Sequence, residues 1–394
     1  MKKVLSLDIK YSAIQVLYFG AFCALLGYAS VFLLAKGFSN SIIGVVLALV
    51  STIAVFAQPI VASFADKNQH IELRYIIAII LIVAIGLSAV IYFLKDATIW
   101  LLCVFVGIAT CMMTITPLLN SLAFLFEKRG IEINYGLARG LGSASYALVS
   151  FALGYIVEDL GSSVIPLVYL IFNILLIIIV YSFVLPQQDG QQIEKKEEKQ
   201  EETQLSFIQF AIKYKKFTVF ILGTVLVFFT HTIINNFFIQ ILRPIGGSES
   251  DMGTAIFLAA ILELPAMGLF NVIRQKFGCS KLIKISVILF ALKHALTFIA
   301  PNMTMIYMAQ ILQIGAYAIN TPACVYYVNQ IIAKKDMIKG QSMVTMAVTA
   351  SGIIANLVGG ILLDVMSVHS VLFIGVIISI LGAMIVIAST ENAK

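Results

Sequence analysis

The chain has 394 residues, of which 60% are hydrophobic and 12% charged, and its mean hydropathy is +1.01. A soluble protein carries about a quarter charged residues, so this composition excludes a soluble globular domain. The net charge of +6 is spread over short loops, which excludes a basic nucleic-acid-binding patch, and no nucleic-acid partner is expected.

Apolar runs of about 20 residues recur along the chain, and each can cross a lipid bilayer as a helix. The sequence predicts twelve spans, at 14–35, 41–64, 74–94, 98–126, 135–157, 163–185, 217–242, 253–273, 281–300, 303–332, 341–363 and 369–389. The first run follows MKKVLSLDIKYS without a small-residue cleavage site, so no cleaved signal peptide is expected. The predicted fold is an all-α membrane protein.

A polar, low-complexity stretch divides the spans into two sets of six. We expect an N-terminal six-helix bundle at 1–185, a flexible cytoplasmic linker at 186–205 and a C-terminal six-helix bundle at 206–394. Residues 206–217 carry apolar side chains on one face and lysines near their end, which predicts an interfacial helix. Two such sets are typical of a transporter with a central site between two parallel repeats.

Lysine and arginine predict the orientation. With both termini in the cytoplasm, 21 of the 26 Lys and Arg residues lie on the cytoplasmic side, and only Lys36, Lys95 and Arg243 lie outside. Cytoplasmic loops carry the excess of these residues. We therefore expect a multi-pass protein of the cell membrane with both termini in the cytoplasm, and nothing in the sequence indicates an obligate oligomer, so a monomer is expected.

Three charged residues lie within spans: Arg139, Glu263 and Lys293. A charge inside the bilayer is costly, so each should face protein or water and have a function. A carboxyl that faces a lysine in an alternately wetted cavity can release and take up a proton, so we predict that Glu263 couples protons to transport. A static Glu263–Lys293 pair and a direct contact of Glu263 with the solute stay open, and Arg139 can instead snorkel to the membrane surface.

Polar residues mark a candidate cavity. On span 303–332 they recur at spacings of three, four and three, which places them on one helical face: Gln310, Gln313, Tyr317 and Asn320. Two pairs on other spans lie four residues apart: His231 with Asn235, and Thr116 with Asn120. We predict five solute contacts in this set: Asn120, Asn235, Gln313, Tyr317 and Asn320. Hydrogen bonding between helices is the alternative for each of them, and the favoured one for His231.

The two halves also resemble each other. Spans 135–157 and 341–363 are rich in small residues, and both end in a glycine, three apolar residues and an acid, at Gly154 to Glu158 and Gly360 to Asp364. Small residues let helices approach closely. The five cysteines form no CxxC pair and no catalytic set stands out, so we expect no disulfide, metal site or cofactor, and no enzyme.

The segment QPIVASFADK, at 58–67, resembles the loop signature of the major facilitator superfamily. In that family an Asp–basic pair helps to hold the cytoplasmic gate, which implies this role for Asp66 and Lys67. The copy in the second half, NVIRQKFG at 271–278, keeps only the basic residues and Gly278.

The segment YGLARGLGSASYAL, at 135–148, resembles the lactose permease branch, which includes oligosaccharide:proton symporters and phenylpropionate-type permeases. The resemblance implies that Arg139 binds the solute and that Tyr146 stacks on it. Lys293 stands near the position of an arginine on the ninth span of relatives, and we count it among the residues predicted to bind the solute. Gln313 and Ala316 replace the histidine and glutamate of that branch, so its proton pathway is not carried over.

Together these features predict a secondary active transporter that works by alternating access, with no ATP-binding domain in the chain. We expect proton symport of a small polar or anionic solute, which is a sugar, a nucleoside or a small carboxylate, and two embedded cations against one acid favour the carboxylate slightly. The alternative is a drug or metabolite exporter, a proton antiporter on the same fold. A membrane sensor on a transporter fold is a further rival, and a signalling domain would be expected for it.

Overall fold

The computed structural model describes residues 2–68, 70–94, 97–127, 133–184 and 206–391, and these residues form helices and no strand. The helices of the first half are α1 (Lys2–Phe22), the π-helical η1 (Cys23–Gly27), α2 (Ala29–Ala35), α3 (Asn40–Lys67), α4 (Leu73–Phe93), α5 (Ile99–Glu127), α6 (Tyr135–Leu160) and α7 (Val164–Ser182). Those of the second half are α8 (Phe207–Lys213), α9 (Lys215–Asn236), α10 (Phe238–Leu242), the 3₁₀ turn η2 (Arg243–Ile245), α11 (Glu249–Gly268), α12 (Phe270–Phe277), α13 (Cys279–Ile299), α14 (Met303–Ile311), α15 (Gln313–Ile331), the 3₁₀ turn η3 (Lys334–Asp336), α16 (Met337–Val365) and α17 (Val368–Ser389).

The helices follow the predicted spans. In the described part of the chain, 11 helical segments are long and apolar enough to cross a membrane. The remaining predicted span, 303–332, is helical but interrupted at Leu312, which divides it into α14 and α15. The all-α membrane fold is therefore confirmed. Three other predicted spans also contain more than one helical element: 14–35 covers the end of α1, η1 and α2, 217–242 covers α9 and α10, and 253–273 covers α11 and the start of α12.

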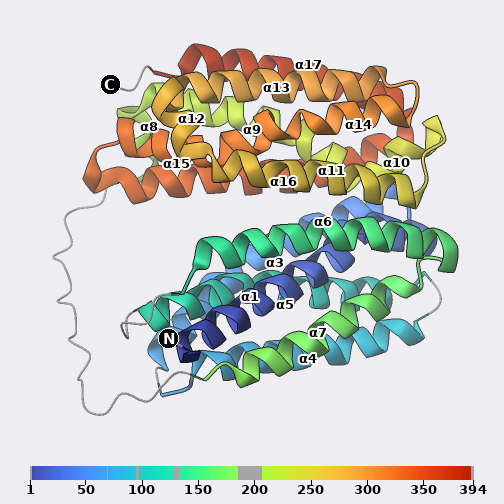
Figure 1. The fold of residues 1–394 in the computed structure, drawn as a ribbon. Helices are drawn as coiled ribbons and strands as arrows, with labels where there is room; N and C mark the ends of the chain where they lie inside the picture. The colour runs from blue at the N-terminus through green and yellow to red at the C-terminus, as the bar shows by residue number, and fades with distance from the viewer. Residues whose placement is uncertain (1, 69, 95–96, 128–132, 185–205, 392–394) are drawn as a thin grey trace.

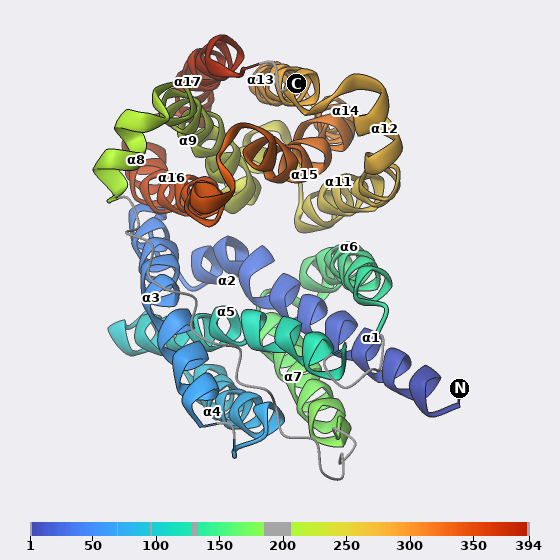
Figure 2. The same cartoon turned by 90° about the vertical axis from the view of Figure 1, so that its left-hand side faces the viewer.

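The two halves form two bundles that meet at one end (Figure 1). At the closed end, on the right of Figure 1, the beginning of α3 lies against the end of α16, and the beginning of α11 lies against the end of α6. At the open end, on the left, the ribbons of the bundles diverge. Figure 2 looks at the open end and shows α3 and α6 of the first bundle facing α16 and α11 of the second.

The apolar cores agree with this arrangement. The core of the first bundle continues across the closed end into the second bundle through buried residues such as Phe237, Phe238 and Met252. The rest of the second bundle has a separate core around residues such as Phe220 and Phe290. Apolar contact between the bundles is thus concentrated at the closed end.

Prolines recur at equivalent places in the two bundles. Four spans contain one beyond the first turn of the helix: Pro59 in α3, Pro117 in α5, Pro265 in α11 and Pro322 in α15. These are the second and fourth spans of each bundle, which is the pattern of a repeat. A proline inside a helix removes one backbone hydrogen bond and favours a local bend.

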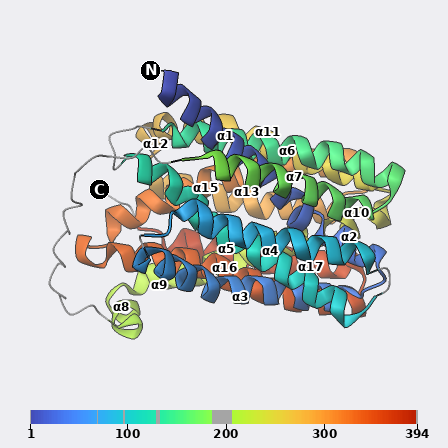
Figure 3. The ribbon, with the colours of Figure 1, turned by 90° about the horizontal axis from the view of Figure 1, so that it is seen from below.

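The predicted interfacial helix is α8. It begins with a capping box in which the Ser206 and Gln209 side chains each accept a hydrogen bond from the other residue's backbone N–H. Ile208 and Ile212 are exposed, whereas Phe210 is buried. Figure 3 shows α8 and α12 at the open end. The predicted linker 186–205 lies outside the described residues.

Candidate functional site

A buried lysine lies at the centre of the second bundle. Lys293, on α13, has no exposed surface, and its Nζ donates a hydrogen bond to Oε1 of Gln313 at 2.6 Å. The same amide donates through Nε2 to Oε1 of Glu263 on α11, at 2.9 Å. Gln313 therefore bridges the two predicted charged residues, with its oxygen on the cation and its nitrogen on the acid.

Local structure places these groups. Gln313 is the first residue of α15, directly after the interruption at Leu312. Glu263 lies two residues before Pro265 in α11. A buried ammonium is tolerated when hydrogen bonds and an opposite charge compensate for its lost hydration, and Gln313 and Glu263 provide both.

Arg139 comes to the same region from the first bundle. It is half-buried on α6, and one of its N–H groups donates to Ser143 Oγ at 2.8 Å. Its guanidinium carbon lies 4.0 Å from the centre of the Phe19 ring on α1, which is a cation–π contact. Both Arg139 and Lys293 lie close enough to act electrostatically on Glu263. The structure thus brings the three embedded charges together.

Two half-buried tyrosines accompany these charges. Tyr146, on α6, has its ring 6.5 Å from that of Phe22. Tyr317, on α15, stacks on His231 at 5.7 Å with the rings 25° apart. Both tyrosines lie within electrostatic range of Glu263. Tyr146, predicted to stack on the solute, and Tyr317, predicted to contact it, therefore both lie near Glu263.

Asn235 is exposed on α9, although its neighbours on that helix are mostly buried. Its Nδ2 lies 3.0 Å from Nε2 of His231. A second histidine, His294, is fully buried next to Lys293, and its Nδ1 lies 2.8 Å from Ser379 Oγ. His231 Nδ1 and His294 Nε2 are buried without a hydrogen-bond partner.

The polar stripe of span 303–332 points largely into the second bundle. Gln310 and Asn320 are 3% and 4% exposed. The Nδ2 of Asn320 donates to Ser286 Oγ on α13 at 2.7 Å, so this side chain joins two helices in the present conformation. Tyr317 is the member of the stripe with substantial exposed surface. Asn120 is half-buried on α5 in the first bundle.

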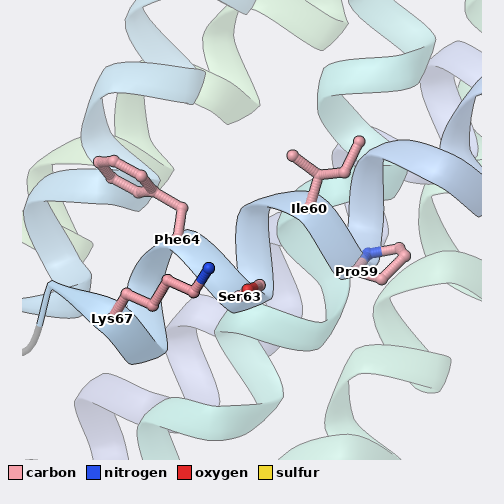
Figure 4. Close-up of a pocket in the computed structure, with 5 residues that line it drawn as sticks. All are labelled: Pro59, Ile60, Ser63, Phe64 and Lys67. Carbon is pink, nitrogen blue, oxygen red and sulfur yellow. The ribbon is translucent and has the colours of Figure 1, made fainter.

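The predicted gate residues, Asp66 and Lys67, are exposed at the open end of α3. Figure 4 shows Lys67 beside a surface hollow of about 440 Å³ that is lined by residues of this one helix: Pro59, Ile60, Ser63, Phe64 and Lys67. None of the embedded charged residues Arg139, Glu263 and Lys293 lines this hollow, which is open to the surroundings. In this conformation the two gate residues are accessible.

Sequence reasoning missed three residues that position the site: Phe19, Ser143 and His294. Two of them had a signal in the sequence, because Ser143 follows Arg139 by one helical turn and His294 adjoins Lys293. Phe19 had none, because its contact with Arg139 depends on how α1 packs against α6.

Comparison with known proteins places the chain among transporters. The model of the MFS_1 like family matches residues 8–374. The uncharacterized transporter YwbF of Bacillus subtilis (strain 168) is 24% identical over 382 residues, which cover 94% of this chain and 91% of YwbF. The maltose permease of Geobacillus stearothermophilus is 23% identical over 387 residues, which cover 96% of this chain and 93% of the permease.

Solved transporter structures share the fold. The crystal structure of the nucleoside transporter NupG has a TM-score of 0.79 at 16% identity and covers 98% of this chain and 99% of its own. A bacterial homologue of the human lysosomal transporter Spinster, in an inward-facing and unoccupied conformation, has a TM-score of 0.67 at 16% identity and covers 98% of this chain and 97% of its own.

Proposed function

This chain belongs to the MFS_1 like family, and from that membership we propose that it is a secondary active transporter that takes up a small polyhydroxylated solute, a sugar or a nucleoside, by proton symport. The relatives are transporters and not enzymes, and the fold is that of a multi-pass membrane protein. The solute, the coupling ion and the direction of transport are the proposed part.

One observation carries the proposal: Arg139 and Glu263 belong to different bundles and approach each other with their side chains half-buried. A solute that hydrogen-bonds to both residues joins the two bundles across the central site. Its binding free energy can then favour the conformations in which the bundles are closed around it.

The charge balance supports a neutral solute. The sequence alone counted two embedded cations against one acid, but Lys293 has no exposed surface and is bonded to Gln313. The half-buried charges are then one cation, Arg139, and one acid, Glu263. A guanidinium donates to paired hydroxyls and a carboxylate accepts from them, so this pair suits a solute with adjacent hydroxyl groups.

Two further features support the solute class. Tyr146 and Tyr317 provide half-buried aromatic rings near Glu263, and such rings pack on the flat face of a sugar or a base. Two of the similar proteins are named for a sugar and for nucleosides, maltose permease and the nucleoside transporter NupG. Small carboxylates remain in the test as the contrasting class.

Glu263 is the proposed proton carrier. A charged carboxylate is costly to carry through the membrane interior, and protonation removes that cost. When the proton leaves, Gln313 donates to the carboxylate, and Lys293 on the other side of the amide stabilises the negative charge. Loading and release of a proton at one residue therefore accompany the change of access.

The orientation follows from the distribution of lysine and arginine. We place the open end, where α8 and the gate residues Asp66 and Lys67 lie, in the cytoplasm of a protein in the cell membrane. The structure then corresponds to an inward-facing state. We expect a monomer, because nothing in the sequence indicates an obligate oligomer.

The experiment uses purified protein in liposomes that contain a pH-sensitive dye. A panel of sugars, nucleosides and small carboxylates is added to wild type, to Glu263→Gln and to Asp159→Asn, a control that removes an exposed acid at the end of α6. We expect a sugar or a nucleoside to move protons with wild type and with the control but not with Glu263→Gln. The Glu263→Gln variant should still exchange labelled solute across the membrane.

Other results would reject parts of the proposal. Solute uptake without proton movement, or normal coupling by Glu263→Gln, would exclude Glu263 as the proton carrier. Proton movement with carboxylates alone would exclude the solute class. Protons that move against the solute would identify the alternative, an exporter that works as an antiporter.

A further inference from the structure

The closed end is held by a carboxylate from each bundle. Asp364, at the end of α16, lies against the first turn of α3 in the other bundle. Its Oδ1 accepts hydrogen bonds from the backbone N–H and the side-chain Nδ2 of Asn40, both at 3.0 Å, and its Oδ2 accepts from the backbone N–H of Ser41 at 2.7 Å. The acid thus satisfies backbone donors that have no partner within their own helix.

The second carboxylate repeats the arrangement on the other side of the molecule. Glu158, at the end of α6, lies against the first turn of α11, and its Oε2 accepts from the backbone N–H of Ser250 at 3.1 Å. Each of the two receiving helices already has a serine at its N-cap, Ser39 for α3 and Ser248 for α11. In both cases the acid comes from the opposite bundle and adds to that cap.

A glycine four residues before each acid allows the helices to touch. A Cβ atom on Gly360 would collide with the backbone oxygen of Asn40, and one on Gly154 would lie 2.6 Å from the backbone oxygen of Glu249. The facing glycines are Gly44 on α3 and Gly253 on α11, and a Cβ atom on either would collide with the opposite backbone. The repeated sequence of glycine, three apolar residues and acid therefore forms the same contact twice.

We propose that Glu158 and Asp364 are a matched pair of latches that holds the closed end shut, and that each opening of this end breaks both. A helix N-terminus carries partial positive charge, so a carboxylate placed there stabilises the contact. The two latches close α6 on α11 and α16 on α3, which are the two edges of the interface between the bundles. The inference rests on the proposed alternating access, and it assigns to these two acids a share of the free energy that keeps this end closed.

The latches change the ratio between molecules whose closed end is shut and molecules in which it is open. Removing the charge while keeping an oxygen acceptor, as in Glu158→Gln and Asp364→Asn, weakens the contact only in the closed state. A single charge at a helix N-terminus of ordinary strength changes the ratio of open to closed molecules by roughly threefold, and two independent contacts change it by roughly tenfold.

Spin-label distances test this without any solute. Labels at Ser163→Cys in the first bundle and Pro301→Cys in the second, both exposed at the closed end, report its opening when the five native cysteines are replaced. We expect each single latch variant to lower the ratio of short-distance (closed) to long-distance (open) molecules by roughly threefold relative to wild type, and the double variant to lower it by roughly tenfold. The control Asp159→Asn, which removes the neighbouring charge, should leave the distances unchanged.

An unchanged distance distribution in the double variant would overturn the inference, and so would an equal shift in Asp159→Asn. If the double variant does not give monodisperse protein, the two single variants decide: a shift in both supports the latches, and no shift in either rejects them. Because the measurement needs neither solute nor protons, its result is independent of the solute class and of the role of Glu263.

Discussion

Lys293 and Glu263 are joined through the side-chain amide of Gln313 and not by a direct ion pair. The amide is polarised in the same sense by both neighbours, because its oxygen faces the cation and its nitrogen faces the acid. If the hydrogen bond from Lys293 breaks, the buried ammonium loses its acceptor, and if the hydrogen bond to Glu263 breaks, the Gln313 Nε2 loses its acceptor. Gln313 therefore positions the two charged residues, and its contribution can be separated from theirs.

Replacing Gln313 by leucine should destabilise the protein by about 1–3 kcal/mol, because the buried ammonium of Lys293 loses its acceptor. Chemical or thermal unfolding in detergent measures the loss. Gln310→Leu is the matched control, since Gln310 is an equally buried glutamine of the same span. The double variant Lys293→Met with Gln313→Leu should recover part of the loss, because both polar partners are then absent. An equal cost for both glutamines would contradict the bridge.

Removing the hydroxyl that holds Arg139 should weaken solute binding. Ser143→Ala should raise KM by roughly tenfold and change the maximal rate little, since a hydrogen bond to a charged group contributes about 1.5–3 kcal/mol. Initial rates of solute uptake over a range of concentrations provide both constants. Ser145→Ala is the control, because Ser145 lies on the same helix but donates to the backbone oxygen of Val16. The same rise in KM for both variants would remove the special role of Ser143.

Alanine at two glycines of α16 should have opposite effects. At Gly360 the new methyl group collides with the backbone of Asn40, whereas at Gly352 it meets open space. Gly→Ala inside a helix otherwise stabilises by about 1 kcal/mol. We expect Gly352→Ala to be neutral or stabilising and Gly360→Ala to lower the unfolding temperature and to open the closed end. Equal behaviour of the two variants in unfolding would argue against close backbone contact at Gly360.

The attachment of α8 predicts a pH dependence. Lys213 donates to Asp336 Oδ2 at 2.6 Å, and this hydrogen bond raises the pKa of Lys213 above its usual value of 10.5. A raised lysine pKa means that the contribution of the pair is fully present below pH 10.5 and is lost as the pH rises through the higher folded-state pKa.

Asp336→Asn should therefore lower the unfolding temperature by a constant amount between about pH 6 and 9, and the difference from wild type should shrink in stronger alkali. Thermal unfolding of both proteins from about pH 6 to above pH 10.5, the usual pKa of lysine, measures the constant difference and its decrease. Glu391→Gln, which removes the exposed partner of Lys216, is the control and should have a smaller effect. A difference that grows with alkaline pH would contradict the predicted sign.

The sequence predicted the helical spans well because the bilayer imposes a strong requirement on length and polarity. The interruption at Leu312 was not predictable, since neither proline nor glycine occupies that position. The repeat of glycine and acid at the ends of α6 and α16 was visible, but its contacts were not. They depend on which helices of the other bundle lie opposite, and the sequence of one helix does not contain that information.

The charged members of the site were predictable because few charges occur within the spans. The free-energy cost of a charge inside the bilayer marks Arg139, Glu263 and Lys293 as functional candidates. The bridge through Gln313 was not predictable, since it depends on the rotation of α15 relative to α11 and α13. The stripe of span 303–332 gave a face but not the direction in which it points, and Asn320 faces Ser286 in this conformation. The roles predicted for the individual solute contacts stay predictions.

The interruption at Leu312 lies directly before the residue that bridges the charges. Gln313 is therefore the first residue of α15, while its two polar partners lie on α13 and α11. Any displacement of α15 relative to those two helices changes both hydrogen bonds of this one amide together. The position of α15 and the electrostatic environment of Glu263 are thus coupled through a single side chain.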